Sequence, residues 1–267
     1  MKRFLGDSNR RRPAAKSAKR NASDDAVRRA RHRPRLDPRR VRRFQRALLA
    51  WYRRQGRDLP WRRTRDPWAI LVSEVMLQQT QVRRVLDYYP RFLARYPTAA
   101  ELAAARPGAV RQSWAGLGYY RRAVNLHRAA RLVQTRHGGD LPASVEALAR
   151  LPGIGRYTAG AVVCFAFGAP ASILDTNAAR VLARIFGHGP RRGRTRRLWA
   201  IADRVLPPRR AYAFNQAIMD LGATVCTARR PRCGGCPVRR ACSALARRDA
   251  VTRTRATTAR GAPPRPG

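Results

Sequence analysis

Two acidic residues have surroundings that suit chemistry. Glu74 lies in a helical stretch, residues 70–77, in which the other side chains are apolar except for Ser73. Burial among such neighbours raises the pKa of a carboxyl group, so Glu74 is predicted to keep its proton and to act as a general acid. Asp175 precedes another helical pattern, where the helix dipole favours an ionised carboxylate, and Asn177 is placed to orient it. The alternative interpretations are a surface glutamate and an ordinary N-cap.

Four of the five cysteines are clustered. Cys226, Cys233, Cys236 and Cys242 have the spacing C-x6-C-x2-C-x5-C. Without a secretion signal, such a cluster favours a metal site over disulfides. Tetrahedral zinc usually takes paired C-x2-C knuckles, and this loop has one such pair, which favours a four-cysteine iron–sulfur cluster. Cys164 stands apart on an apolar helical stretch and is predicted to be an inert core thiol.

A glycine-containing turn separates two helical patterns. Leu151 and Pro152 end the first pattern, Gly153-Ile154-Gly155 forms the turn, and the second runs from Arg156 to about Phe167. Both glycines are expected to use positive φ, and their backbone N–H groups can hold a phosphate oxygen at the start of the second helix. The pattern therefore predicts a helix–hairpin–helix that binds the DNA backbone. A glycine-rich helix linker is the simpler alternative.

The charge of the chain also indicates a polyanionic partner. The 267 residues carry 58 Lys+Arg against 15 Asp+Glu, a formal net charge of +43. Such an excess favours nucleic acid as the partner, although a genome-wide bias toward arginine would produce part of it. No apolar run reaches the ~20 residues of a membrane span, and no secretory signal follows Met1. We expect a soluble intracellular protein and a monomer.

The sequence patterns around these residues predict short helices. Asp37-Pro38 and Asp66-Pro67 are helix-start signals, and 98–101 is a capping box. After residue 80 we expect Thr80 to cap a helix with Val82, Val85, Leu86 and Tyr89 facing inward. No strand alternation is evident, so the predicted class is all-α. Residues 1–36 and 246–267 are predicted to be basic disordered tails.

Together these motifs resemble one family. The chain is similar to the helix–hairpin–helix DNA glycosylases that carry a [4Fe–4S] cluster, and within them to the MutY-type adenine DNA glycosylases. The resemblance implies a helical barrel domain at 66–169 and an iron–sulfur cluster domain formed by 37–65 and 170–245. It is carried by the motifs LPWR (59–62), SEVMLQQTQV (73–82), GLGYYRRAVNLH (116–127), LPGIGRYTAG (151–160), ILDTN (173–177), FNQAIMDLGA (214–223) and the cysteine loop.

The resemblance implies roles for individual residues. In this family, adenine mispaired with 8-oxoguanine or guanine in double-stranded DNA is flipped out and excised, which needs protonation of the base and stabilisation of an oxocarbenium-like sugar. Glu74 would protonate the base, and Asp175 would stabilise the cation or form a transient covalent bond. The implied DNA contacts are Arg62 and Gln216 near the adenine, Gln79 as a wedge in the stack, Tyr119 beside the opposing base, and Gln78, Thr80, Leu117, Gly153 and Gly155 on DNA-facing loops. Tyr119 or Leu117 could instead belong to the core.

Two departures from the family pattern bear on activity. Family members often carry a C-terminal domain that reads 8-oxoguanine, and this sequence stops at Gly267 without it. Relatives that cleave the strand have a lysine where this chain has Tyr157, and the last lysine here is Lys19. A tyrosine hydroxyl can hydrogen-bond near the sugar but cannot form an imine. We therefore expect a monofunctional glycosylase that leaves an intact abasic site.

Two other functions fit part of the sequence. A mismatch thymine or uracil glycosylase of similar fold can also have tyrosine after the hairpin, but thymine has no N7 to protonate, so Glu74 argues against it. A non-catalytic DNA-binding protein with zinc or an iron–sulfur cluster would explain the charge and the cysteines. The presence of both Glu74 and Asp175 argues against that interpretation.

Overall fold

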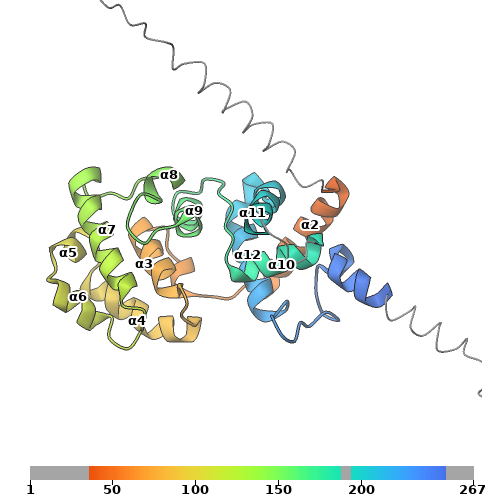
Figure 1. Ribbon diagram of the computed structural model, residues 1–267, viewed down its shortest axis with the longest axis horizontal. Coiled ribbons are helices and arrows are strands. Elements are labelled where there is room, and N and C mark those ends of the chain that lie inside the picture. Colours follow the sequence, from red (N-terminus) through yellow and green to blue (C-terminus); the bar gives the residue numbers. More distant parts are fainter. Residues whose placement is uncertain (1–35, 188–193, 251–267) are drawn as a thin grey trace, which may run out of the picture. The chain divides into compact units, whose positions relative to one another are not determined.

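The computed structural model describes residues 36–187 and 194–250, and these ranges contain helices, turns and no strand (Figure 1). The all-α prediction is therefore confirmed. The predicted disorder of 1–35 and 251–267 lies outside the described residues. Two details differ from the predicted tails: Leu36 is buried, and residues 243–250 are helical. In the described ranges, no helix combines the length and the apolar character that a membrane crossing requires.

Local capping signals fix where several helices begin. The Asp37 carboxylate accepts from the backbone N–H of Arg39 at 2.9 Å, and Asp66 accepts from that of Trp68 at 3.0 Å. Thr98 and Glu101 form the predicted capping box. The helices are α2 (Pro38–Gln55), α3 (Pro67–Leu77), α4 (Val82–Arg95), α5 (Ala99–Ala104), α6 (Pro107–Ser113), α7 (Arg121–His137), α8 (Val145–Leu148), α9 (Arg156–Phe165), α10 (Thr176–Phe186), α11 (Arg194–Val205) and α12 (Ala211–Thr224), with 3₁₀ turns η1 (Pro60–Arg62), η2 (Pro208–Arg210) and η3 (Arg239–Ala241).

Two hydrophobic clusters hold these helices. The first runs from Leu59 through α3–α9 to Ile173, with Ala211 added from α12. The second joins α2, α10, α11 and α12 to Val238 and Ala241 of the cysteine loop. Leu59 and Trp61, which precede α3, pack in the first cluster. The site described below lies where α9 and α12 meet, between the two clusters.

Three local predictions were wrong. Leu86, expected to face inward, is 37% exposed. Gln81 rather than Thr80 precedes α4, and no side chain caps that helix. Gly153 has the predicted positive φ of 76°, but Gly155 has φ −90° and needs no left-handed freedom. Helix α6, which begins at Pro107, was not predicted.

Candidate active site

Glu74 lies in the middle of α3 and is 4% exposed. Almost every side chain of α3 is buried, because the helix packs against α4 and α9. Burial is the main cause that raises the pKa of Glu74 to about 7. The hydrogen bond with the Tyr157 hydroxyl lowers this pKa, the negative charge of Asp175 raises it, and the positive charge of Arg62 lowers it. One carboxyl oxygen, Oε2, is buried and has no hydrogen-bond partner in the described part of the chain. The carboxyl is thus a proton donor near neutral pH with one oxygen unsatisfied.

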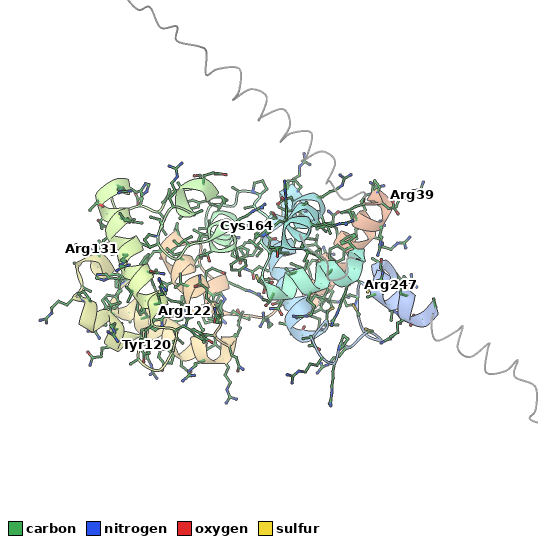
Figure 2. The ribbon with its side chains drawn as sticks, in the orientation of Figure 1. Arg39, Tyr120, Arg122, Arg131, Cys164 and Arg247 are labelled. Carbon is green, nitrogen blue, oxygen red and sulfur yellow. The ribbon has the colours of Figure 1, made fainter. Side chains whose placement is uncertain are left out.

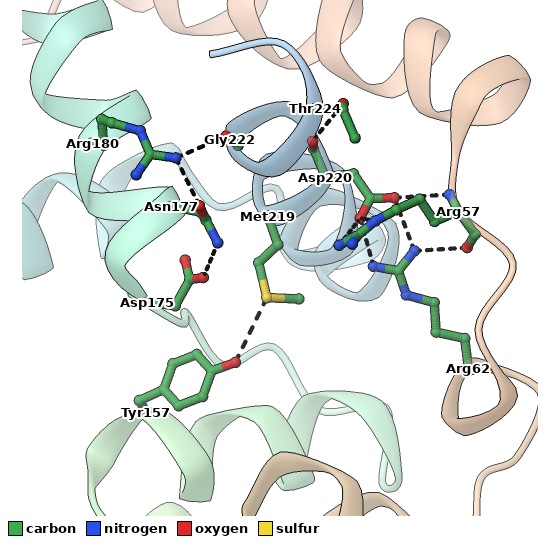
Figure 3. A network of polar contacts seen from close by, with 10 residues as sticks. All are labelled: Arg57, Arg62, Tyr157, Asp175, Asn177, Arg180, Met219, Asp220, Gly222 and Thr224. Atoms are coloured by element: carbon green, nitrogen blue, oxygen red, sulfur yellow. Dashed lines mark hydrogen bonds and ion pairs between the residues drawn. The ribbon is translucent and has the colours of Figure 1, made fainter. Parts of the chain in front are cut away.

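Asp175 caps α10 with its carboxylate held on both oxygens. Oδ1 accepts from the backbone N–H of Ala178 at 2.6 Å, and Oδ2 accepts from the Asn177 amide at 2.9 Å. Arg180 donates to the Asn177 side-chain oxygen and to the Gly222 carbonyl, at 2.7 Å each (Figure 3). Because Arg180 fixes the Asn177 side-chain oxygen, the NH₂ group of Asn177 points toward Asp175.

A glycine allows α12 to approach α10 at this point. A Cβ at Gly222 would lie 2.6 Å from the Asn177 Cβ and 3.0 Å from the Asn177 carbonyl oxygen. Only glycine fits there, so the helices cross closely enough for α12 to form one wall of the site. On the next turn back along α12, the Met219 sulfur is 3.7 Å from the Tyr157 hydroxyl of α9 (Figure 3).

Asp220 on α12 is fully buried and holds two arginines (Figure 3). It accepts from the backbone N–H and side chain of Arg57, at 2.9 and 2.7 Å, and from both terminal nitrogens of Arg62, at 2.9 and 2.8 Å. Burial alone would raise the pKa of Asp220, but hydrogen bonds and charge from Arg62 hold it below its ordinary value. Arg62, predicted to lie near the base, has a buried Nε without a hydrogen-bond partner among the described residues.

Gln216 lies on the same face of α12 as Met219 and Asp220, three and four residues earlier. As a residue it is 3% exposed. The buried polar atoms of this site that lack a hydrogen-bond partner among the described residues are the Arg62 Nε and the Glu74 Oε2. These two atoms, with the Gln216 amide beside them on α12, give the site polar groups available to a ligand.

The predicted DNA-contacting residues divide into exposed and buried ones. Gln79 and Tyr119 are exposed, and both have a left-handed backbone, with φ of 57° and 49°. Gln78 donates to the Thr158 hydroxyl at 3.2 Å, and the Thr80 hydroxyl accepts from Arg122 at 3.0 Å. Leu117 is 2% exposed and packs in the first hydrophobic cluster, which gives its side chain a structural role instead of the expected DNA contact.

The hairpin between α8 and α9 presents free backbone donors. The N–H groups of Gly153 and Gly155 donate to no acceptor among the described residues, whereas Ile154 donates to the Leu151 carbonyl at 3.2 Å. A Cβ at Gly153 would lie 2.8 Å from the Asn125 Cβ, but one at Gly155 would meet no atom within 4 Å. The two glycines therefore serve different purposes: Gly153 makes the turn, and Gly155 leaves open space in front of α9.

The four clustered cysteines line one cavity of about 190 Å³, together with apolar side chains such as Leu221 and Val225. Arg184 of α10 donates to the Cys226 sulfur at 3.4 Å and to the Thr227 carbonyl at 2.6 Å. Within the ranges described, no three His, Cys, Asp or Glu side chains are arranged to hold a metal ion. The cysteines thus share a cavity without converging on a single-ion site. Cys164 is fully buried elsewhere.

Comparison with known proteins identifies the family. Residues 72–203 match the HhH-GPD superfamily of base excision DNA repair proteins. The thymine-DNA glycosylase of Aeropyrum pernix is 41% identical over 214 residues, covering 78% of this chain and 96% of that protein. The chain belongs to the HhH-GPD superfamily. Adenine DNA glycosylases are also similar: the human enzyme is 46% identical over 216 residues (76% of this chain, 40% of that one), and that of Mycolicibacterium smegmatis is 48% identical over 193 (72% and 66%).

Solved HhH-GPD structures agree with the fold. A thermostable thymine-DNA glycosylase superposes with a TM-score of 0.73 at 30% identity, covering 78% of this chain and 98% of that one. An endonuclease III in a trapped covalent DNA intermediate gives 0.71 at 24% identity, covering 80% and 100%. The resemblance inferred from the motifs is thereby confirmed. The chain spans about 40% of the length of the mammalian adenine glycosylases that it matches.

Sequence reasoning missed three residues that organise this HhH-GPD site: Asp220, Gly222 and Arg122. All three lie in motifs that carried the family resemblance, but their roles depend on partners far away in sequence. An isolated acid in the apolar stretch 217–221 was the available signal for Asp220. No sequence signal identified the distant acceptors of Arg122, because three of them are backbone carbonyls at the end of α3.

Proposed function

We propose that the protein is a monofunctional adenine DNA glycosylase, which excises adenine mispaired with 8-oxoguanine or guanine in duplex DNA and leaves an abasic site. The observation that carries this proposal is Glu74, a buried carboxyl whose pKa is raised to about 7 and whose Oε2 has no partner in the described structure. A proton held near neutral pH in a dry site is what departure of a purine base requires. The similarity to adenine glycosylases supports the same substrate. The enzyme would act on the bacterial nucleoid.

The reaction divides between the two carboxyl groups. Glu74 donates its proton to N7 of the flipped adenine, and the C1′–N9 bond breaks with its electron pair passing to the base. The Asp175 carboxylate, held by Asn177 and the α10 N-terminus, stabilises the positive charge that develops on the sugar or bonds to C1′ transiently. Water then supplies hydroxide to C1′, and its remaining proton goes to the Glu74 carboxylate, which restores the acid.

Base recognition would use polar groups of the site. The Arg62 Nε is buried without a partner among the described residues, and Gln216 is a largely buried residue of α12, so a polar base edge would bind to both. Asp220 keeps Arg62 in place by accepting from both of its terminal nitrogens. The Tyr157 hydroxyl would hydrogen-bond near the sugar. It lies close enough to Glu74 to lower the pKa of that carboxyl, and its hydrogen bond to the Met219 sulfur is weak.

The loops and the hairpin would engage the DNA. Gln79 would fill the stack vacated by adenine, and Tyr119, which is 58% exposed, would contact the opposing base. Gln78 and Thr80 flank the wedge. The free N–H groups of Gly153 and Gly155 would hold a backbone phosphate.

The four cysteines of the loop share one cavity. Cys226, Cys233, Cys236 and Cys242 line it, and their spacing contains a single C-x2-C pair, whereas tetrahedral zinc usually takes two such pairs. We propose that they hold a [4Fe–4S] cluster, which would tie the cysteine loop to α10 and α12 and take no part in excision. The Arg184 donor to the Cys226 sulfur is the kind of hydrogen bond that such thiolates accept.

Thymine excision is the second candidate. It is favoured by the Aeropyrum pernix thymine-DNA glycosylase, of which the alignment covers 96%. The protonated Glu74 argues for a purine, because thymine lacks the N7 acceptor.

The two candidates are separated by an assay on three duplexes, with A opposite 8-oxoguanine, A opposite guanine and T opposite guanine, each followed by alkali. We expect strand breaks at adenine in the first two and none at thymine. Breaks confined to the T-containing duplex would replace this proposal with the second candidate.

A further inference from the structure

Two residues of the described chain share an uncommon backbone conformation. Gln79 and Tyr119 are the only non-glycine residues with positive φ within residues 36–187 and 194–250. For side chains of this size the left-handed region is an outlier that costs on the order of 1 kcal/mol or more, and it persists only where surrounding contacts enforce it. Both residues lie at element ends, Gln79 after α3 and Tyr119 before α7, forty residues apart in sequence.

One side chain contacts both of these turns. Arg122, in the first turn of α7, is 8% exposed. Its Nη1 donates to three carbonyls at the end of α3, those of Val75 (3.0 Å), Met76 (2.6 Å) and Gln78 (2.6 Å). Its Nη2 and Nε donate to the Thr80 hydroxyl (3.0 Å) and to the carbonyls of Gly118 (3.0 Å), Leu117 (3.5 Å) and Tyr119 (3.4 Å).

These bonds enclose Gln79 on both sides and reach Tyr119 itself. The carbonyl before Gln79 and the hydroxyl after it are fixed to the same guanidinium as the carbonyl of Tyr119. The Arg122 guanidinium also lies 5.4 Å from the centroids of the Trp114 and Tyr119 rings. The two turns are therefore joined through one planar group.

No carboxylate accounts for this arrangement. None of the ion pairs in the described part of the chain includes Arg122, and burial lowers its pKa. A buried cation without an acidic partner is costly, so seven backbone and hydroxyl contacts must compensate for it. Five N–H donors in a rigid fork suit such a cluster of acceptors, whereas a lysine ammonium offers three donors from one point.

We propose that Arg122 is a positioning residue that joins the Gln79 and Tyr119 turns into one rigid unit, so that wedge and opposing-base contact enter the DNA together. This inference rests on the proposed function, because it assigns the joined turns to base extrusion. With Arg122 in place, the Gln79 wedge already has its final conformation when the base is extruded. Without the Arg122 guanidinium, the Gln79 and Tyr119 turns would each relax independently from their strained conformations.

The test compares Arg122→Lys with Arg131→Lys, an exposed arginine two and a half turns along the same helix (Figure 2). Extrusion is followed by the fluorescence of 2-aminopurine placed opposite guanine, which reports unstacking whether or not the base is excised. Excision is measured in single turnover on a mismatched duplex and on a duplex whose target adenine is already unpaired in a bulge.

We expect Arg122→Lys to slow extrusion and to reduce mismatch excision on the order of 10²-fold, as a small misplacement of a positioned group does. On the bulged adenine the loss should be below tenfold, because extrusion is no longer required. Arg131→Lys should match the parent throughout. Equal losses on both substrates, or unchanged 2-aminopurine kinetics, would assign Arg122 only to capping of α3 and overturn the inference.

A second variant covers the case in which Arg122→Lys does not fold. Thr80→Val removes one acceptor of Nη2 and leaves the arginine in place. It should slow extrusion in the same direction by a smaller factor, and normal extrusion in this variant would contradict the proposal. A parent protein that extrudes 2-aminopurine but excises no adenine would refute the proposed function without affecting this inference.

Discussion

At the scale of single residues, the buried carboxyl of Glu74 has a cost in stability that depends on pH. Burial, opposed by Tyr157 and Arg62 and assisted by Asp175, raises the pKa of Glu74 from 4.5 to about 7. An unfolded chain releases this proton near pH 4.5, whereas the folded one retains it to about pH 7. Stability therefore falls as pH rises between these values, by at most about 3 kcal/mol, and the penalty is constant above them.

Glu74→Gln removes this pH-dependent penalty. In urea unfolding, we expect the stability of the variant relative to the parent to increase between about pH 4.5 and 7, by up to ~3 kcal/mol, and then to stay level. A stability difference that does not change across this range would show that Glu74 ionises normally in the folded protein.

The residues that the structure describes contain no lysine, and this leads to a second prediction at residue scale. Strand cleavage by β-elimination needs an amine that forms an imine at C1′, and the last lysine of this chain is Lys19. Borohydride should therefore trap little covalent complex, and nicking should require added base or heat. Tyr157→Lys should create trapping, because Tyr157 lies beside Glu74. If borohydride traps the parent protein on DNA strongly, and still does so after deletion of residues 1–35, the protein is not a monofunctional glycosylase.

Residue types were enough to propose Glu74 and Asp175 as an acid pair, but not to predict the contacts around the proposed site. Glu74 could be predicted because a lone acid in an apolar helix is costly to bury and therefore indicates a functional carboxyl, and Asp175 because it combined an N-cap with Asn177. Asp220 and Arg122 could not, since Asp220 bonds to Arg62 and Arg122 bonds to the end of α3, in each case more than forty residues away and brought close by helix packing. The fixed orientation of Arg62 and the placement of Gln79 therefore emerged only from the fold.

At the scale of elements, capping signals predicted several helix starts but not that of α4, where Thr80 does not cap the helix. The starts after Asp37 and Asp66 and the Thr98 capping box were confirmed, because each depends on contacts within a few residues. Leu86 was placed on the wrong side of α4, since its exposure depends on which neighbours pack there. Helix α6 was missed because its first turn, Pro107-Gly108, reads as a loop.

The hairpin allows fold and DNA binding to be tested separately. Gly155 has φ −90° and room for a Cβ, so Gly155→Ala should leave the melting temperature unchanged or slightly raised. If its N–H approaches a phosphate, the methyl group should weaken binding to all duplexes on the order of tenfold, as loss of a bond to a charged group does. Gly153→Ala, at φ 76° and 2.8 Å from Asn125, should destabilise the fold itself. Loss of binding by Gly155→Ala for one mismatch alone would mean that the hairpin reads bases.

At the scale of the whole molecule, the site depends on two hydrophobic clusters held side by side. The acid comes from α3 in the first cluster, and Asp175 and Asp220 come from α10 and α12, which pack in the second. The cysteine loop adds Val238 and Ala241 to that second cluster. A bound cluster would therefore stabilise the half of the molecule that carries the charged side of the site.

Metal analysis tests this role of the cysteine loop. The purified protein should be brown and contain about four iron and four sulfide per chain. Cys236→Ser should lose the iron and lower the melting temperature, whereas Cys164→Ala, at a buried cysteine outside the loop, should retain it. A colourless, fully active protein with one zinc would contradict the assignment.

Single-turnover kinetics on a duplex with adenine opposite 8-oxoguanine tests whether Glu74 supplies the proton for adenine excision. Glu74→Gln keeps the shape of the side chain and removes the acid, so excision should fall by on the order of 10²- to 10⁴-fold while mismatch binding persists. Glu146→Gln, an exposed glutamate on α8, should excise at the parental rate. A near-parental rate for Glu74→Gln would show that Glu74 is not the proton donor.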